Sequence, residues 1–388
     1  MKITKLMLSA LVAAAALVSC NKEETTPVDG NLKTVTLSLE NIIKTKGIGA
    51  PITPEADGTM PAVQVNNFKV FLTDASYSPG YAAKTADGTQ NATFYFSSAA
   101  DLNRKLEFHY VDNKCTKVVV VANMGDVSFE QVMGENRGID QQQNPTTLVL
   151  YGEDNLSSTG RQHTDAETGK LTDVYEAKIT LKPTISRFEV AGFVTEFSTP
   201  TPKFNKVAVT DIAFQHYFPH LGASTADGLK IAGTGSHVLH IANDKLNNDA
   251  VVHGWFNGAA STGWFRDHFA TPLEMTPAAP EADAPNDLAY HFYSGEIIPT
   301  MIIRLLADGI PAHVYTSTYK RAGEAGALTK LEPGKIYRMS AAGQVDTDGS
   351  IIIPDDKIDP IERCIEVEVE VVDWVVELVT PEFKTGHL

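Results

Sequence analysis

The segment from Lys33 to Ile43 reads KTVTLSLENII, and its apolar residues Val35, Leu37 and Leu39 occupy every second position. In a β-strand, successive side chains point to opposite faces of the sheet, so this period of two is typical of a strand with one buried face. We therefore predict a strand near the start of the folded chain.

Strand patterns recur along most of the sequence, separated by glycine, proline, asparagine and aspartate. Many short strands with such turns favour antiparallel β-sandwiches, and 388 residues are enough for two of them. The further predicted strands are Phe68 to Leu72, Thr93 to Phe96, Lys105 to Val111, Lys117 to Ala122, Thr147 to Tyr151, Ala177 to Leu181, Ile185 to Phe193, Lys206 to Phe214, Met301 to Leu306 and Lys335 to Met339.

Helix signals are few by comparison. Ser128 with Gln131 three residues later is the pattern of a capping box, and Gly134 suits a helix end, so a short helix is predicted there. The predicted fold is therefore all-β with a few short helices, in two tandem antiparallel β-sandwich domains that meet near Pro183. The Gly- and Ala-rich residues 216–296 are predicted as long loops on the second domain.

The end of the chain carries a second strong strand pattern. Its apolar positions shift by one residue partway, and they are Ile365, Val367, Val369 and Val371, then Trp374, Val376 and Leu378. One extra residue between two in-phase halves predicts two consecutive strands joined by a bulge or bend. The preceding residues, Asp346 to Pro360, contain two prolines and five aspartates and are predicted as a hinge-like linker.

The first residues have the features of a bacterial lipoprotein precursor. Lys2 and Lys5 precede an apolar run of about 13 residues, and Leu17-Val18-Ser19-Cys20 matches the lipobox at which a signal peptidase cuts. The run is shorter than the ~20 residues that a membrane-spanning helix needs. We predict export, lipidation of Cys20 and anchoring through acyl chains such as palmitate. An ordinary secretory signal with a chance cysteine is the alternative.

Charge and cysteine content narrow the choice of partners. The formal net charge is −16, and it becomes about −18 without the signal segment, since 30 Lys and Arg then face 48 Asp and Glu. No basic cluster stands out, so nucleic acid and anionic lipid surfaces are poor partners.

A disulfide between Cys115 and Cys364 stays open, and two buried free thiols in strands are the favoured interpretation.

Taken in order, these segments resemble the fimbrillins of type V pili, the FimA-like major fimbrial subunits. The resemblance covers more than 300 residues, and it rests on the order of the segments together with the lipobox. Beyond the first strand, the segments are Phe68 to Leu72, Lys117 to Gly125 with the short helix after it, Leu181 to Phe188, Ile298 to Met301, Pro333 to Met339 and Val369 to Phe383.

The resemblance implies a structural subunit with transthyretin-like domains, no cofactor and no enzymatic activity. It implies a signal peptide over 1–19, a lipid-anchored propeptide over 20–46, two sandwich domains over 47–182 and 183–360, and a donor segment over 361–388. An extracellular protease would remove the propeptide with the strand that holds Val35, Leu37 and Leu39. The vacated groove would then accept the C-terminal strands of another copy or a related subunit, building an extracellular fimbrium from the outer membrane.

The sequence departs from the family at the processing site. Processing there is commonly at arginine, yet no arginine precedes Arg104. The candidate sites are Lys44 and Lys46, in a glycine-containing segment that is predicted as an accessible loop after the first strand. The identity of the protease and of the cleaved lysine therefore stays open.

Residues of catalytic or metal-binding type do not form a recognisable site. Seven histidines between His216 and His291 lack acidic or cysteine partners at metal-site spacing, and they are interpreted as scattered loop and surface residues. The turn Asp346 to Gly349, followed by Asp355 and Asp356, lacks the full spacing of a calcium loop. A nucleophile elbow and a phosphate-binding loop are both absent from the sequence.

The sequence leaves functions other than that of a stalk subunit open. Trp255 and Trp264 would suit the sugar platform of an outer-membrane glycan-binding lipoprotein of a nutrient-uptake system, although packing is the plainer interpretation. An anchor subunit would keep its first strand, and a tip subunit would lack a donor strand. In a monomer, the last strands would stay packed in the second domain.

Overall fold

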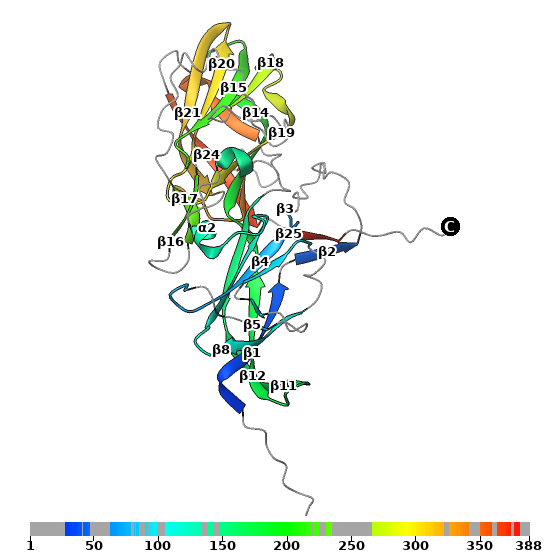
Figure 1. Ribbon diagram of the computed structural model, residues 1–388. Helices are drawn as coiled ribbons and strands as arrows, with labels where there is room; N and C mark the ends of the chain where they lie inside the picture. Colours follow the sequence, from blue (N-terminus) through cyan, green and yellow to red (C-terminus); the bar gives the residue numbers. More distant parts are fainter. Residues whose placement is uncertain are drawn as a thin grey trace, which may run out of the picture.

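The computed structural model describes residues 28–40, 42–46, 63–78, 81, 83–84, 90–91, 93–98, 105–133, 138–142, 148–218, 220–224, 230–234, 266–321, 326–340, 350–358, 363–373 and 376–380. Its strands form two domains, the lower and the upper one in Figure 1. Sheet membership changes between β13 (Lys182–Pro183) and β14 (Ile185–Glu196), on either side of Thr184. The prediction of an all-β, two-domain fold is confirmed.

The N-terminal domain is a sandwich of two sheets. One sheet has the order β11-β12-β1-β8-β5-β6 and the other β13-β10-β9-β4-β7. The rings of Phe94 and Phe108, one from each sheet, lie 4.6 Å apart, so the two sheets face each other across an apolar core. The strands are β1 (Val28–Glu40), β4 (Phe68–Thr73), β5 (Ala83–Lys84), β6 (Gln90–Asn91), β7 (Thr93–Phe96), β8 (Leu106–Asp112), β9 (Lys117–Ala122), β10 (Leu150–Asn155), β11 (Ser157–Thr164) and β12 (Leu171–Thr180).

Two short helices lie on the side of this domain that faces the other one. Helix α2 (Phe129–Met133) begins with the predicted capping box, since the Ser128 amide donates to Gln131 Oε1 at 2.7 Å and the Gln131 amide donates to Ser128 Oγ at 3.1 Å. The 3-10 helix η2 (Ile139–Gln142) contacts the C-terminal domain, where His291 Nδ1 lies 2.7 Å from the Gln142 carbonyl oxygen.

The C-terminal domain is one nine-stranded sheet in the order β18-β15-β20-β21-β24-β22-β14-β19, with β23 also on β14. The ring centroids of Phe188 on β14 and Phe214 on β15 lie 6.2 Å apart, although several strands separate β14 from β15 in the sheet. The sheet therefore curls over onto itself around an aromatic core. Its other strands are β15 (Val207–Gln215), β18 (Arg266–Met275), β19 (Glu281–Tyr293), β20 (Thr300–Ala307), β21 (Ile310–Arg321), β22 (Lys335–Ser340), β23 (Ser350–Pro354) and β24 (Arg363–Asp373).

Two small sheets complete the described structure. A hairpin joins β16 (His220–Ser224) to β17 (Lys230–Thr234). A three-stranded parallel sheet brings together β2 (Ile42–Lys46), β25 (Val376–Thr380) and β3 (Val63–Gln64), beside the N-terminal domain in Figure 1.

Three sequence expectations are wrong in detail. The sheets are mixed rather than purely antiparallel, because β1 pairs in parallel with β12 and β14 with both β22 and β23. The expected hinge contains strand β23 over 350–354, which pairs in parallel with β14 and fully buries Ile351 and Ile353, and the 3-10 helix η3 (Asp355–Lys357) follows it. The expected loops over 216–296 include two long strands, β18 and β19. These strands form the two ends of the sheet order, where proline is tolerated, and each of them contains one proline.

Candidate functional site: the first strand and the end of the chain

Strand β1 is an interior strand of its sheet. It pairs in parallel with β12, where Leu37 lies opposite Ala177, and antiparallel with β8, where Leu37 lies opposite Leu106. The first strand of the chain is therefore held by a ladder of backbone hydrogen bonds on each side. Its removal would leave two unpaired strand edges in the middle of the sheet.

The apolar face of β1 points into the sandwich core as predicted. Val35 is fully buried, Leu37 is 1% exposed, and Leu39 packs against the core from a half-buried position. These side chains close one wall of the N-terminal core.

The opposite face of β1 is buried too, which the alternating pattern did not predict. Thr34 Oγ1 lies 2.8 Å from Thr172 Oγ1 and 3.3 Å from His109 Nδ1. The Thr36 hydroxyl donates to the Tyr175 carbonyl oxygen at 3.1 Å. Threonine is small and can satisfy its hydroxyl locally, so it fits between larger neighbours in an interior strand.

Lys33 contributes to this site in a way that the sequence did not reveal. Its side chain is buried; Nζ donates to the main-chain oxygens of Cys115 and, at 3.3 Å, of Asn113, and lies 4.6 Å from the Tyr175 ring centroid. Burial lowers the pKa of Lys33, although nearby Cys115 and Asp112 act in the other direction. The period of two places Lys33 on the same face as Val35, but lysine is rarely buried, so the sequence did not indicate that its side chain lies inside the sandwich.

Cys115 lies in the turn that Lys33 reaches, between β8 and β9, and it is a free, buried thiol. Burial raises the pKa of the Cys115 thiol to about 11. Cys364 belongs to β24 of the other domain, where its Cα partner is Tyr315. The disulfide that the sequence left open is therefore not formed, and Cys115 lies in a turn rather than in a strand.

The end of the chain forms two consecutive strands, β24 and β25, as the shift in pattern predicted. Strand β24 lies between β21 and β22, with Ile365, Val367 and Val369 buried and Val371 half-buried. Strand β25 leaves this sheet and pairs in parallel with β2, placing Val376 opposite Ile42 and Leu378 opposite Lys44. Trp374 lies outside the described residues.

Lys44 and Lys46 lie in strand β2, not in the loop that was expected. The physical reason is that β25 offers a partner strand from the far end of the chain, which no local pattern announces. Strand β2 is nevertheless an edge strand, in the order β2-β25-β3, so its other side is unpaired within the described residues. Residues 47–62, with the glycines of the expected loop, lie outside the described part.

Among the described residues, no group of three or more His, Cys, Asp and Glu side chains could hold a metal ion. His216 lies 2.9 Å from Thr300 Oγ1, His268 lies 3.0 Å from Asp211 Oδ1, and His291 is fully buried. Outside the described residues lie Cys20, His237, His240, His253, Trp255, Trp264 and the turn at 346–349.

No helix within the described segments is both long and apolar enough to span a membrane. The Cys20 anchor therefore stays a prediction from the lipobox.

Comparison with known proteins gives distant structural similarity. The sequence matches no protein-family model and no curated protein. The chain is similar to a candidate cell-adhesion protein of Bacteroides eggerthii, with 16% identity, 91% of this chain and 99% of the other covered, and a TM-score of 0.44. It is also similar to the fimbrilin FimA of Porphyromonas gingivalis W83, with 12% identity, coverages of 89% and 99% and a TM-score of 0.43.

A third solved structure is the C-terminally truncated tip fimbrial protein Mfa3 of Porphyromonas gingivalis, with 10% identity, coverages of 88% and 99% and a TM-score of 0.40. Identities and TM-scores this low describe a remote likeness. The function of this chain must therefore be inferred from its own strands and contacts.

Proposed function

We propose that this chain is a structural, non-enzymatic subunit of a type V pilus, most simply of its stalk, and that it polymerises by strand exchange. In this proposal Cys20 anchors the precursor to the outer membrane, and an extracellular protease cuts at Lys44 or Lys46. Strand β1 then leaves, and C-terminal strands of another copy take its place. The observation that carries the proposal is the interior position of β1, with both faces buried and a candidate cleavage segment directly after it.

The position that β1 occupies between β8 and β12 is called the slot. The energetics of the slot favour replacement of β1 by another strand over loss of β1 without replacement. Burial of Val35 and Leu37 contributes roughly 3–6 kcal/mol in gross terms, at about 1.5–3 kcal/mol for each side chain. Departure of β1 also strips hydrogen bonds from β8 and β12. An empty slot would therefore be unstable, and a strand from a neighbouring subunit supplies the missing side chains and backbone partners. Because donor and acceptor surfaces differ, repetition gives an open filament.

The pairing of β2 with β25 supports a link between cleavage and donation. Lys44 lies opposite Leu378, and Lys46 lies opposite Thr380. A cut at either lysine would let β1 leave and would also break the strand on which β25 rests. One proteolytic event would thus open the acceptor slot and leave the donor strand β25 paired with β3 alone.

The two donor strands differ in how firmly they are held. Strand β24 is paired on both sides, and Ile365, Val367 and Val369 are part of the core of its own domain. Strand β25 belongs only to the three-stranded sheet. Within the donor segment 361–388 we therefore expect β25, with Val376 and Leu378, to move first and β24 to act as its stem.

The test is limited trypsin digestion of the chain from Asn21 onward, followed by intact mass, electron microscopy and labelling of Cys115 with a thiol reagent. Cleavage at Lys44 or Lys46 should release the β1 fragment, expose Cys115 and produce ladders or filaments. Lys44→Gln/Lys46→Gln is the matched uncut control, and deletion of residues 376–388 should allow the cut but abolish polymers. A chain that is cut, loses β1 and stays monomeric would exclude the proposed function.

A further inference from the structure

A groove of about 600 Å³ lies between the two domains, where the N-terminal domain meets the C-terminal one. Tyr151, Pro183, Leu331 and Pro333 give it an apolar lining. Lysines at 178, 182 and 330 also line it, two from the N-terminal domain and one from the C-terminal domain. Such a concentration of positive charge is unexpected on a chain whose net charge is −16.

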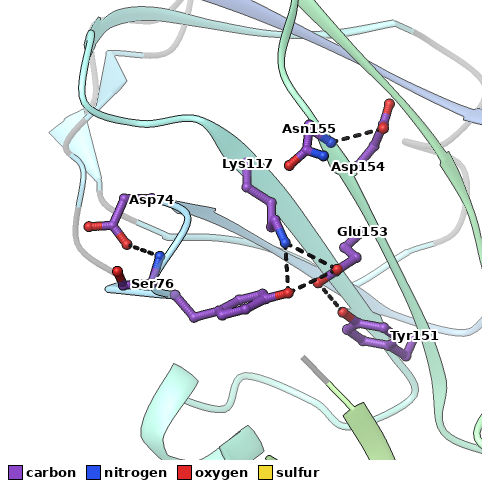
Figure 2. Close-up of polar contacts among 8 residues, drawn as sticks. Asp74, Ser76, Lys117, Tyr151, Glu153, Asp154 and Asn155 are labelled. Atoms are coloured by element: carbon purple, nitrogen blue, oxygen red, sulfur yellow. Dashed lines mark hydrogen bonds and ion pairs between the residues drawn. The ribbon is translucent and has the colours of Figure 1, made fainter. Parts of the chain in front are cut away.

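The lysines of the groove are not neutralised by its own acidic residue. Glu153 Oε1 accepts hydrogen bonds from Tyr77 at 3.0 Å and from Lys117 at 3.2 Å, while Oε2 accepts one from Tyr151, so its carboxylate is already engaged (Figure 2). Lys182 and Lys330 are exposed and make no ion pair within the described residues. Their ammonium groups are therefore available to an anionic partner.

The groove continues the slot that β1 occupies. Along β12 and β13 the residues Ala177, Ile179 and Leu181 are buried, and the alternate positions Lys178, Thr180 and Lys182 face outward. Strand β1 runs parallel to this row, with Ser38 opposite Lys178 and Glu40 opposite Thr180. The resident strand thus places an acidic residue at a register position between two of the groove lysines.

We propose that this groove receives the acidic C-terminal segment of a second copy of the chain, and that its lysines set the charge requirement for a donor strand. This inference rests on the proposed function. From Cys364 to Phe383 the segment has no lysine or arginine and six carboxylates; those at 366, 368, 370 and 373 lie in the stem strand β24, and those at 377 and 382 lie in or just after β25, the strand that is expected to move first. A donor strand that pairs with β12 would reach the groove along the row that holds Lys178 and Lys182. The alternating apolar residues of the donor strand match the apolar lining of the groove.

The charge-reversed variant Lys182→Glu/Lys330→Glu tests the proposal, with Lys206→Glu/Lys357→Glu as a control of equal charge change outside the groove. After proteolytic cutting, the groove variant should polymerise on the order of tenfold more slowly than wild type at low ionic strength, because complementary charge speeds encounter. High ionic strength should narrow this difference through screening. The control should follow wild type at both ionic strengths. If the Glu variant does not fold, Lys182→Gln/Lys330→Gln provides the same comparison with a smaller effect.

The possible outcomes separate this inference from the proposed function. If cut wild-type chains do not polymerise, the strand-exchange function itself fails. If wild type polymerises and the groove variant matches it at low ionic strength, the groove has no role in donor binding although the function stands. A defect that persists unchanged at high ionic strength would contradict charge recognition. Binding of a sulfated polysaccharide that is lost in the variant, with assembly unaffected, would assign the groove to a glycan instead.

Discussion

The Lys33 ammonium group donates to the main-chain oxygen of Cys115, joining the first strand to a turn 82 residues further along the chain. The contact places a charged side chain inside the sandwich, where it also bonds the Asn113 oxygen and lies over the Tyr175 ring. Because all these partners lie outside β1, Lys33 ties the strand to its slot by polar contacts, and the buried apolar residues of β1 add to this.

Replacement of Lys33 by methionine should destabilise the chain by about 1–3 kcal/mol, because the turn oxygens lose their buried donor. Urea unfolding would measure the loss, and Lys114→Met, at an exposed position in the same turn, is the matched control. Unchanged stability in Lys33→Met would mean that relief from burying the charge offsets the lost hydrogen bonds.

Wild type and Lys33→Met should also differ in how their stability depends on pH. The pKa of Lys33 is lowered in the folded state, so above the lowered value the unfolded chain holds more protons than the folded one. Wild-type stability relative to Lys33→Met should therefore rise as the pH increases from the lowered pKa toward about 10.5, the ordinary lysine value. A difference that falls over this range would contradict the burial-lowered pKa.

Leu37→Ala should cost about 2–5 kcal/mol, because it leaves a cavity in a fully packed wall of the core. Leu39→Ala, at a half-buried position on the same face, should cost less. We also expect faster labelling of Cys115 in Leu37→Ala, since a weakened β1 opens the slot more often. Equal costs at the two positions would argue against a distinct buried slot.

Gly152→Ala should destabilise the N-terminal domain by about 1–3 kcal/mol through overpacking. A Cβ at this position would lie 2.5 Å from both Ile179 Cγ2 and the Thr180 carbonyl oxygen, so β10 would have to move away from β12. Thermal unfolding would show the loss. Gly326→Ala is the control, because nothing lies within 4 Å of its added Cβ, and it should be nearly neutral.

His291 should make stability depend on pH below about 6.5. Burial, with Arg187 nearby, lowers its pKa well below the ordinary value, so the folded chain keeps a neutral ring that contacts the Gln142 oxygen and Arg187 Nη1. Below pH 6.5 the unfolded state binds a proton that the folded state excludes, and stability should fall by up to about 1.4 kcal/mol for each pH unit.

The variant His291→Asn should lose this slope, whatever its stability at neutral pH. Urea unfolding at pH 7 and pH 5 would compare it with wild type. An unchanged slope in His291→Asn would show that other groups control acid sensitivity.

Local sequence patterns were sufficient to predict most strands and the start of the one α-helix among the described residues. Segments such as Thr93–Phe96 and Lys117–Ala122 were predicted at their observed bounds, and the Ser128 capping box forms as expected. These features depend on side-chain period and on hydrogen bonds within a few residues, which is information that a sequence carries directly. The same holds for the two consecutive strands at the end of the chain.

Tertiary structure alone decided which strands meet and which polar residues are buried. The inward-facing Lys33, the buried Thr34 and the pairing of β2 with β25 all depend on partners that lie far away in the sequence. The interdomain groove likewise combines Lys182 with Lys330, nearly 150 residues apart. The period of a strand tells which residues share a face, but only packing of the whole chain determines what covers that face.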